Sequence, residues 1–125
     1  FLENKFSKEC AFVVSGEGFT WETQDRARDI AAAKAGWEEA KKFILNPEIG
    51  FILLDEINIA LRYDYLDIDE VIEFLLTKKP PMTHVVLTGR NAKEELITAA
   101  DLVTEMSLIK HPFRDGIKAQ KGIEF

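Results

Sequence analysis

Short apolar runs alternate along the chain with longer segments of helical periodicity. Three of these runs, residues 11–15 (AFVVS), 51–56 (FILLDE) and 83–89 (THVVLTG), each predict a β-strand. The last two lack the alternation of a half-exposed strand, so we expect them to be covered on both faces, as in a parallel sheet. Residues 102–109 (LVTEMSLI) do alternate and predict a half-exposed or edge strand.

The first helical segment follows a glycine-containing loop at residues 16–20. We expect this helix to begin near Trp21 or Glu22, with Thr20 as its cap, and to end at Asn46-Pro47 because the residue before proline disfavours the α conformation. Its apolar stripe consists of Ile30, Ala33, Trp37, Ala40 and Ile44.

Three further helices are predicted, over residues 57–62, 67–79 and 92–100. Capping boxes mark the starts of the last two, formed by Asp67 with Glu70 and by Asn91 with Glu94. The buried stripe of the helix over 67–79 consists of Ile68, Val71, Ile72, Leu75 and Leu76. Asp64, Asp67, Asp69 and Glu70 form a small acidic run, which we interpret as a solvated helix start.

The order of elements predicts the α/β class, with a mostly parallel sheet covered by helices. The 125 residues suit a single domain over 1–125. In such sheets the carboxyl ends of the strands share one edge, where ligands usually bind. The loop 16–20, the pair Asp55-Glu56 and the tripeptide Thr88-Gly89-Arg90 are all expected at this edge.

Composition excludes several functional classes. The net charge of −6 and pI near 5.0 argue against a nucleic-acid binder, which usually presents a basic face. Cys10 is the single cysteine, so no internal disulfide can form, and His84 and His111 lack the spacing of metal ligands. Without a membrane-length apolar run or a signal peptide, a cytoplasmic location and no membrane partner are expected.

Four apolar residues followed by Asp55-Glu56 have the form of a Walker B motif, in which a rigidly held acid binds Mg²⁺ beside a nucleotide phosphate. The alternative is that both acids cap the next helix. The partner motif, a glycine-rich loop ending in Gly-Lys-Ser/Thr, is not found, since no glycine is followed by lysine. Arg90 suits phosphate oxygens, although it could equally be exposed or paired with Glu56.

Phe19 and Trp21 flank Thr20 directly after two glycines. In an extended segment residues two apart point the same way, so the two rings could present one flat apolar surface to a planar ligand. From physics alone, packing of both rings in the core is the stronger interpretation.

Several segments together resemble the P-loop class of ATP:corrinoid adenosyltransferases. They are residues 18–23 (GFTWET), 53–67, 84–90 (HVVLTGR), 100–106 (ADLVTEM) and 110–125 (KHPFRDGIKAQKGIEF). The resemblance implies a P-loop NTPase fold of the RecA-like type, and transfer of the 5′-deoxyadenosyl group of ATP to Co(I) of a corrinoid with release of triphosphate. It makes ATP with Mg²⁺ and the corrinoid the substrates.

The resemblance also assigns roles. Glu56 would bind Mg²⁺, Asp55 would support the metal or the phosphate loop, and Arg90 would help to hold the triphosphate. Phe19 and Trp21 would cover the lower face of the corrinoid, which favours four-coordinate cobalt and makes its reduction easier. A homodimer and an electron-donor protein of the flavodoxin type are further expectations.

The phosphate loop is expected upstream of Phe1, so that the fold is N-terminally incomplete and its exposed sheet edges favour pairing with another copy. We therefore predict that the 125-residue chain alone binds MgATP very weakly or not at all, because backbone N–H groups of that loop supply most triphosphate binding. Isothermal titration measures this directly, and tight binding would contradict it. The alternatives are a non-catalytic corrinoid-binding or interaction module and another P-loop ATPase.

Overall fold

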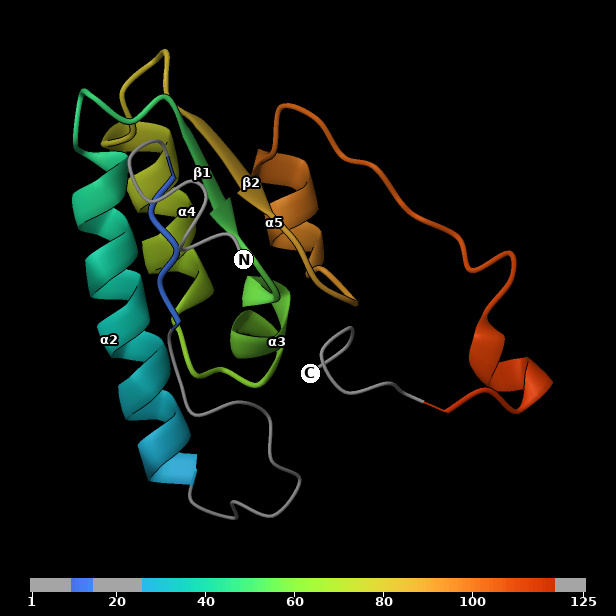
Figure 1. The fold of residues 1–125 in the computed structure, drawn as a ribbon. Coiled ribbons are helices and arrows are strands. Elements are labelled where there is room, and N and C mark those ends of the chain that lie inside the picture. The colour runs from blue at the N-terminus through green and yellow to red at the C-terminus, as the bar shows by residue number, and fades with distance from the viewer. Residues whose placement is uncertain (1–9, 15–25, 119–125) are drawn as a thin grey trace.

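The computed structural model describes residues 10–14 and 26–118, and in this part of the chain helices alternate with strands (Figure 1). The elements are α2 (Arg26–Ile44), β1 (Phe51–Leu54), α3 (Ile57–Arg62), α4 (Ile68–Thr77), β2 (His84–Leu87), α5 (Glu94–Ala99) and the short 3-10 helix η1 (Pro112–Asp115). The α/β class is confirmed. Among the described helices, none is long and apolar enough to cross a membrane.

The two strands pair in parallel and in register. Phe51 lies opposite His84, and Leu54 lies opposite Leu87. The ladder extends by one bond beyond each end, where the His84 amide donates to the Gly50 carbonyl (2.9 Å) and the Thr88 amide donates to the Leu54 carbonyl (3.1 Å). Because both strands end at the same level, the residues that follow them meet at one edge of the sheet.

The helices α2, α3, α4 and α5 build the core on one face of this sheet. Its buried apolar side chains are Trp37, Ile44, Leu61, Leu66, Val71 and Leu96. Ile52 and Leu54 of β1 and Val85 and Leu87 of β2 pack against them. The predicted stripe of α2 is confirmed in Trp37 and Ile44, with its two alanines partly buried beside them.

The prediction that both faces of β1 and β2 are covered is wrong for the face opposite the core. Burial alternates along both strands, and Phe51, Leu53 and Val86 are 62%, 53% and 39% exposed. A continuous apolar run is covered on both faces only where helices pack on both sides of the sheet. The described helices pack on one side. Both strands are also shorter than predicted, so Asp55 and Glu56 lie beyond the end of β1.

Local signals predicted α3 and α4 well. The expected helix over 57–62 is α3, and Asp67 caps α4 by accepting hydrogen bonds from the amides of Asp69 (2.9 Å) and Glu70 (3.2 Å). The Glu70 carboxylate does not complete the capping box, because it instead accepts from Trp37 Nε1 at 3.3 Å. Leu76 was wrongly placed in the buried stripe of α4, since it is 66% exposed.

The predicted cap of the last helix is wrong. α5 begins at Glu94, and Lys93 precedes it without a side-chain capping bond. Asn91 instead takes a left-handed backbone conformation with φ of 56°. Asparagine enters this region more readily than most residues, so here it forms the turn and does not cap the helix. The predicted start of α2 at Trp21, its cap Thr20 and the loop 16–20 lie outside the described residues.

Two predicted strands do not form in the described part of the chain. Residues 11–14 have no regular structure and are exposed, and residue 15 is not described. Residues 102–109 are also exposed and run away from the rest of the domain toward η1 (Figure 1). Strand propensity measures how well a side chain fits a pleated, half-buried surface. A segment with this propensity forms a strand only where another strand of the fold pairs with it.

Candidate functional site

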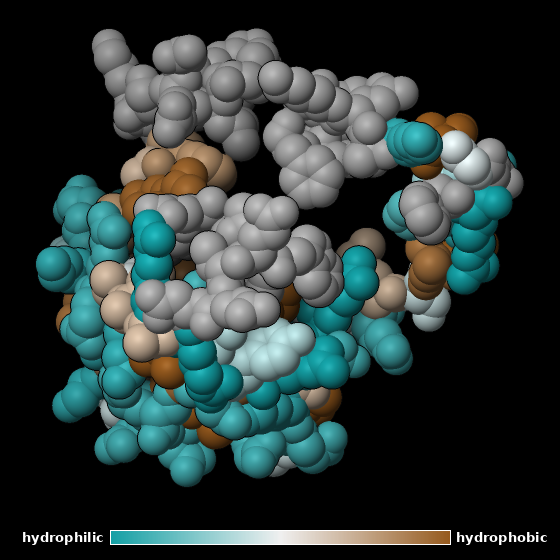
Figure 2. Space-filling model, turned by 90° about the horizontal axis from the view of Figure 1, so that it is seen from below, coloured by the Kyte–Doolittle hydropathy of each residue, from teal (hydrophilic) through white to brown (hydrophobic). Residues whose placement is uncertain are grey.

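Five residues meet where β1 and β2 end, and we call them the strand-end cluster. They are Asp55, Glu56 and Asn58, which follow β1, and Thr88 and Gly89, which follow β2. The parallel register brings the two groups together although they are about thirty positions apart in the chain. Both strands run downward in Figure 1, and from below the described surface of the domain is mainly hydrophilic (Figure 2).

The hydroxyl of Thr88 links the two segments. Its O–H donates to Asp55 Oδ1 at 2.6 Å, and its oxygen accepts from the Glu56 amide at 3.0 Å. The Thr88 carbonyl accepts from the Asn58 amide at 3.2 Å. A β-branched side chain has restricted rotation about its first bond, so Thr88 holds this hydroxyl in one direction. Asp55 thereby fixes the backbone that carries Glu56.

Asn58 also joins the two segments of the cluster. Its side chain is buried, and its Nδ2 donates to the Gly89 carbonyl at 3.1 Å. Its Oδ1 is buried and has no hydrogen-bond partner among the described residues. A buried acceptor without a partner costs free energy, so this atom is a point where a polar ligand atom or water would be stabilising.

Gly89 is required for this approach. Its φ is +126°, and a Cβ atom placed there would lie 2.8 Å from Asn58 Cβ and 3.3 Å from Glu56 Oε2. Carbon atoms pack best at about 3.5–4.0 Å, so any side chain would push the two segments apart. Glycine therefore lets the Glu56 carboxylate lie beside the loop that follows β2.

The strand-end cluster contains one residue with a left-handed backbone, Glu56. Among the described residues, the non-glycine positions with positive φ are Glu56 (58°), Asp64 (56°) and Asn91 (56°). Glu56 belongs to the cluster itself, and the other two lie in the chain segments that continue from it. Such conformations persist only where surrounding contacts hold them, and they gather at functional sites.

The structure brings together some of the predicted site residues. Asp55 and Glu56 lie in the strand-end cluster, and Arg90 is exposed directly after it. Arg90 and Glu56 are both described, and no ion pair joins them, so that alternative is not supported. Phe19 and Trp21 lie outside the described residues. The sequence analysis did not single out Asn58 or the Thr88 hydroxyl. The only available signal for each was a polar residue close to the end of an apolar run.

The donor atoms of the cluster suit a hard divalent cation. They are the carboxylate oxygens of Asp55 and Glu56 together with the unpartnered Oδ1 of Asn58. No group of three or more His, Cys, Asp or Glu residues that could hold a metal occurs within the described ranges. Mg²⁺ usually binds through only one or two carboxylates plus substrate phosphates, so the residues present fit this ion.

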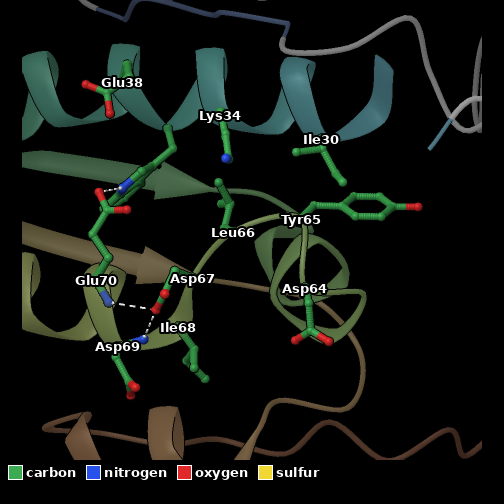
Figure 3. A pocket seen from close by; sticks show the side chains of 11 residues that line it. Ile30, Lys34, Glu38, Asp64, Tyr65, Leu66, Asp67, Ile68, Asp69 and Glu70 are labelled. Carbon is green, nitrogen blue, oxygen red and sulfur yellow. Dashed lines mark hydrogen bonds between the residues drawn. The ribbon is translucent and has the colours of Figure 1, made fainter. Parts of the chain in front are cut away.

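A separate pocket of about 890 Å³ lies between α2 and the segment that leads into α4 (Figure 3). Lys34 points from α2 into this pocket, whereas the carboxylates of Asp64 and Asp69 point away from α2 (Figure 3). Several of its polar groups already have partners within the fold. Asp67 caps α4, and Glu70 accepts hydrogen bonds from Trp37 and from Lys41 Nζ (3.2 Å). The predicted interpretation of this acidic run as a helix start is confirmed for Asp67.

Comparison with known proteins identifies the family. The family model for ATP:corrinoid adenosyltransferase BtuR/CobO/CobP matches residues 2–125. A corrinoid adenosyltransferase of Sinorhizobium sp. is 66% identical over 124 residues, which cover 99% of this chain and 58% of that protein. Corrinoid adenosyltransferases of Pseudomonas aeruginosa and Escherichia coli (strain K12) are 54% and 39% identical, over 97% and 91% of this chain.

This chain spans 58–59% of the length of these relatives. The match nevertheless includes almost every residue of the chain, the strand-end cluster among them. The chain therefore belongs to the ATP:corrinoid adenosyltransferase BtuR/CobO/CobP family.

Proposed function

We propose that the protein transfers the 5′-deoxyadenosyl group of ATP to the cobalt of a reduced corrinoid. The observation that supports this most is the strand-end cluster, which places two carboxylates and the Thr88-Gly89-Arg90 segment at one sheet edge in a chain of this family. This edge is where α/β proteins usually bind nucleotides.

The reaction needs no protein nucleophile. Co(I) attacks C5′ of ATP, a cobalt–carbon bond forms, and the bond between C5′ and its oxygen breaks. The triphosphate leaves with the electron pair of that bond, and Co(I) becomes formally Co(III). The protein therefore has to align the substrates, offset charge on the leaving group and exclude water.

In this proposal Glu56 holds Mg²⁺, and Asp55 keeps Glu56 in place through the Thr88 hydroxyl. When bound, Mg²⁺ offsets negative charge on the triphosphate. Arg90 contacts triphosphate oxygens, for which the planar guanidinium is well suited. Because Arg90 is exposed next to Gly89, it has room to do so. Phe19 and Trp21 cover the lower corrinoid face and exclude axial ligands.

The family resemblance supports further parts of the proposal. They are a P-loop fold of the RecA-like type, residues 1–125 as one domain, a homodimer and an electron-donor protein that reduces cobalt.

Product analysis tests the reaction. The full-length protein is given MgATP, a Co(II) corrinoid and a chemical reductant, and we expect adenosylated corrinoid and triphosphate in equal amounts. Release of diphosphate or phosphate without a cobalt–carbon bond would instead identify an ATPase. Corrinoid binding with no transfer at all would support a non-catalytic module.

The proposed role of Phe19 and Trp21 can be tested separately from the transfer reaction. Replacing either residue with alanine in the full-length protein is expected to lower the yield of four-coordinate Co(II) about tenfold, because water and axial ligands regain access to cobalt. Electron paramagnetic resonance of the Co(II) corrinoid measures this yield. MgATP affinity, measured on the same variants, is the internal control and is expected to stay unchanged. An equal loss of both would show that the rings only stabilise the fold.

A further inference from the structure

The loop over residues 88–93, which carries Arg90, is anchored at both ends to the segment 55–65. At its first end Thr88 and Gly89 bond to Asp55, Glu56 and Asn58, as described above. At its other end Lys93 Nζ bonds to Asp64 Oδ1 at 2.6 Å. Between these anchors Arg90 is exposed. The second anchor is not part of the strand-end cluster and has no role in the function proposed above.

Two cations from separate parts of the chain act on the Asp64 carboxylate. The Lys93 ammonium, hydrogen-bonded to the carboxylate, holds the pKa of Asp64 below its usual range, and the Arg26 guanidinium acts in the same direction. Arg26, the first described residue of α2, also donates from Nη2 to the Tyr63 carbonyl at 3.0 Å and lies 5.4 Å from the ring centre of Tyr65. The 63–65 turn is thus attached both to α2 and to the Arg90 loop.

The backbone conformation of Asp64 indicates that the contact between Asp64 and Lys93 requires a particular residue at position 64. Its φ of 56° is unfavourable for most residues, and aspartate and asparagine tolerate it better than others. The carboxylate is 74% exposed, so the ion pair contributes little to global stability. A strained residue with an exposed ion pair is better explained by local ordering of the loop that it holds.

We propose that Asp64 and Lys93 are positioning residues that hold the Arg90 loop in the conformation that binds the triphosphate. This inference rests on the proposed function, because it assumes that Arg90 meets the triphosphate. It adds that Asp64, in the turn between α3 and α4, contributes to nucleotide affinity through Lys93, which lies 29 positions further along the chain.

The test uses Asp64→Asn in the full-length protein, since asparagine keeps the size and tolerates the left-handed backbone while removing the charge. We expect the dissociation constant of MgATP to rise about two- to fivefold, the range for loss of an exposed ion pair, with corrinoid affinity unchanged. Lys93→Met is expected to give the same change, and the double variant no further loss, because both remove one interaction. Asp69→Asn, an exposed carboxylate on the first turn of α4, is the matched control.

A second measurement does not depend on catalysis. Trypsin cleaves after Arg90, and cleavage of a folded protein reports the population of the opened loop. We expect Asp64→Asn to speed cleavage of the Arg90–Asn91 bond about two- to fivefold, and Asp69→Asn to leave it unchanged. Equal cleavage and equal MgATP affinity in Asp64→Asn and the parent protein would overturn the inference. Tighter MgATP binding would also overturn it, because it would mean that the freed Lys93 binds the triphosphate itself.

Failure of the proposed function is a distinct result. If the parent protein transfers no adenosyl group and binds no MgATP, the proposed function is wrong. The cleavage rates still show whether Asp64 orders the loop.

Discussion

Gly89→Ala is expected to separate the Arg90 loop from the segment that follows β1. The new methyl group would lie 2.8 Å from Asn58 Cβ, and the backbone at φ of +126° is one that side-chain-bearing residues rarely adopt. Asn58 is buried and bonded to the loop through its amide and side chain, so it cannot move aside without losing those bonds. We expect the free energy of unfolding to fall by about 3 kcal/mol, as measured by chemical denaturation. MgATP affinity in the full-length protein falls with it.

Two other glycines provide the controls. Gly116 also has a positive φ, of 78°, but no atom lies within 4 Å of a Cβ built there. Gly50 has open space as well, and its φ is not positive. Gly50→Ala is expected to be nearly neutral, and Gly116→Ala to show the backbone cost alone. If Gly89→Ala behaves like Gly116→Ala, the close contact with Asn58 is not what makes glycine necessary.

Glu56→Gln is expected to have the largest effect on activity. Glutamine preserves the size of the side chain and the backbone bond to Thr88, and it removes the negative charge proposed to hold Mg²⁺. We expect the rate of adenosyl transfer by the full-length protein to fall about a hundredfold, equivalent to about 2.7 kcal/mol of activation free energy. Initial rates at increasing Mg²⁺ concentration measure it, and part of the loss should be recovered at high Mg²⁺.

Glu48→Gln serves as its control. Glu48 is an exposed residue in the turn before β1, at the opposite end of the strand from the cluster. The same loss in both variants, or full activity in Glu56→Gln, would remove Glu56 from the proposed site. Unchanged unfolding free energy in Glu56→Gln would show that a loss of activity is chemical and not structural.

The parts of the fold that depend on residues close together in the sequence were predictable. The helix α3 and the cap at Asp67 follow from signals a few residues long, and the structure confirms both. The sheet was harder to predict, because a strand depends on partners elsewhere in the chain. Residues 102–109 have the alternation of a strand, yet no neighbour pairs with them in the described part of the structure.

The candidate site was predictable at the level of topology. Parallel strands place their carboxyl ends together, so Asp55-Glu56 and Thr88-Gly89-Arg90 were expected at one edge, and they are there. The individual bonds were not predictable. Thr88 reaches Asp55 across 33 positions and Lys93 reaches Asp64 across 29, and no periodic pattern marks either pair.

The left-handed residues at the site describe a trade-off between stability and activity. Glycine at position 56 or 64 would relax the backbone, because it adopts positive φ without steric cost. It would also delete the carboxylate that we propose binds Mg²⁺ at position 56, or the one that we propose positions the loop carrying Arg90 at position 64. Ranking substitutions by stability alone would therefore select changes at these positions that lower MgATP binding or adenosyl transfer. Glycine at position 91 would relieve strain without deleting a group that has a proposed role, but it would also free the backbone of the loop that carries Arg90.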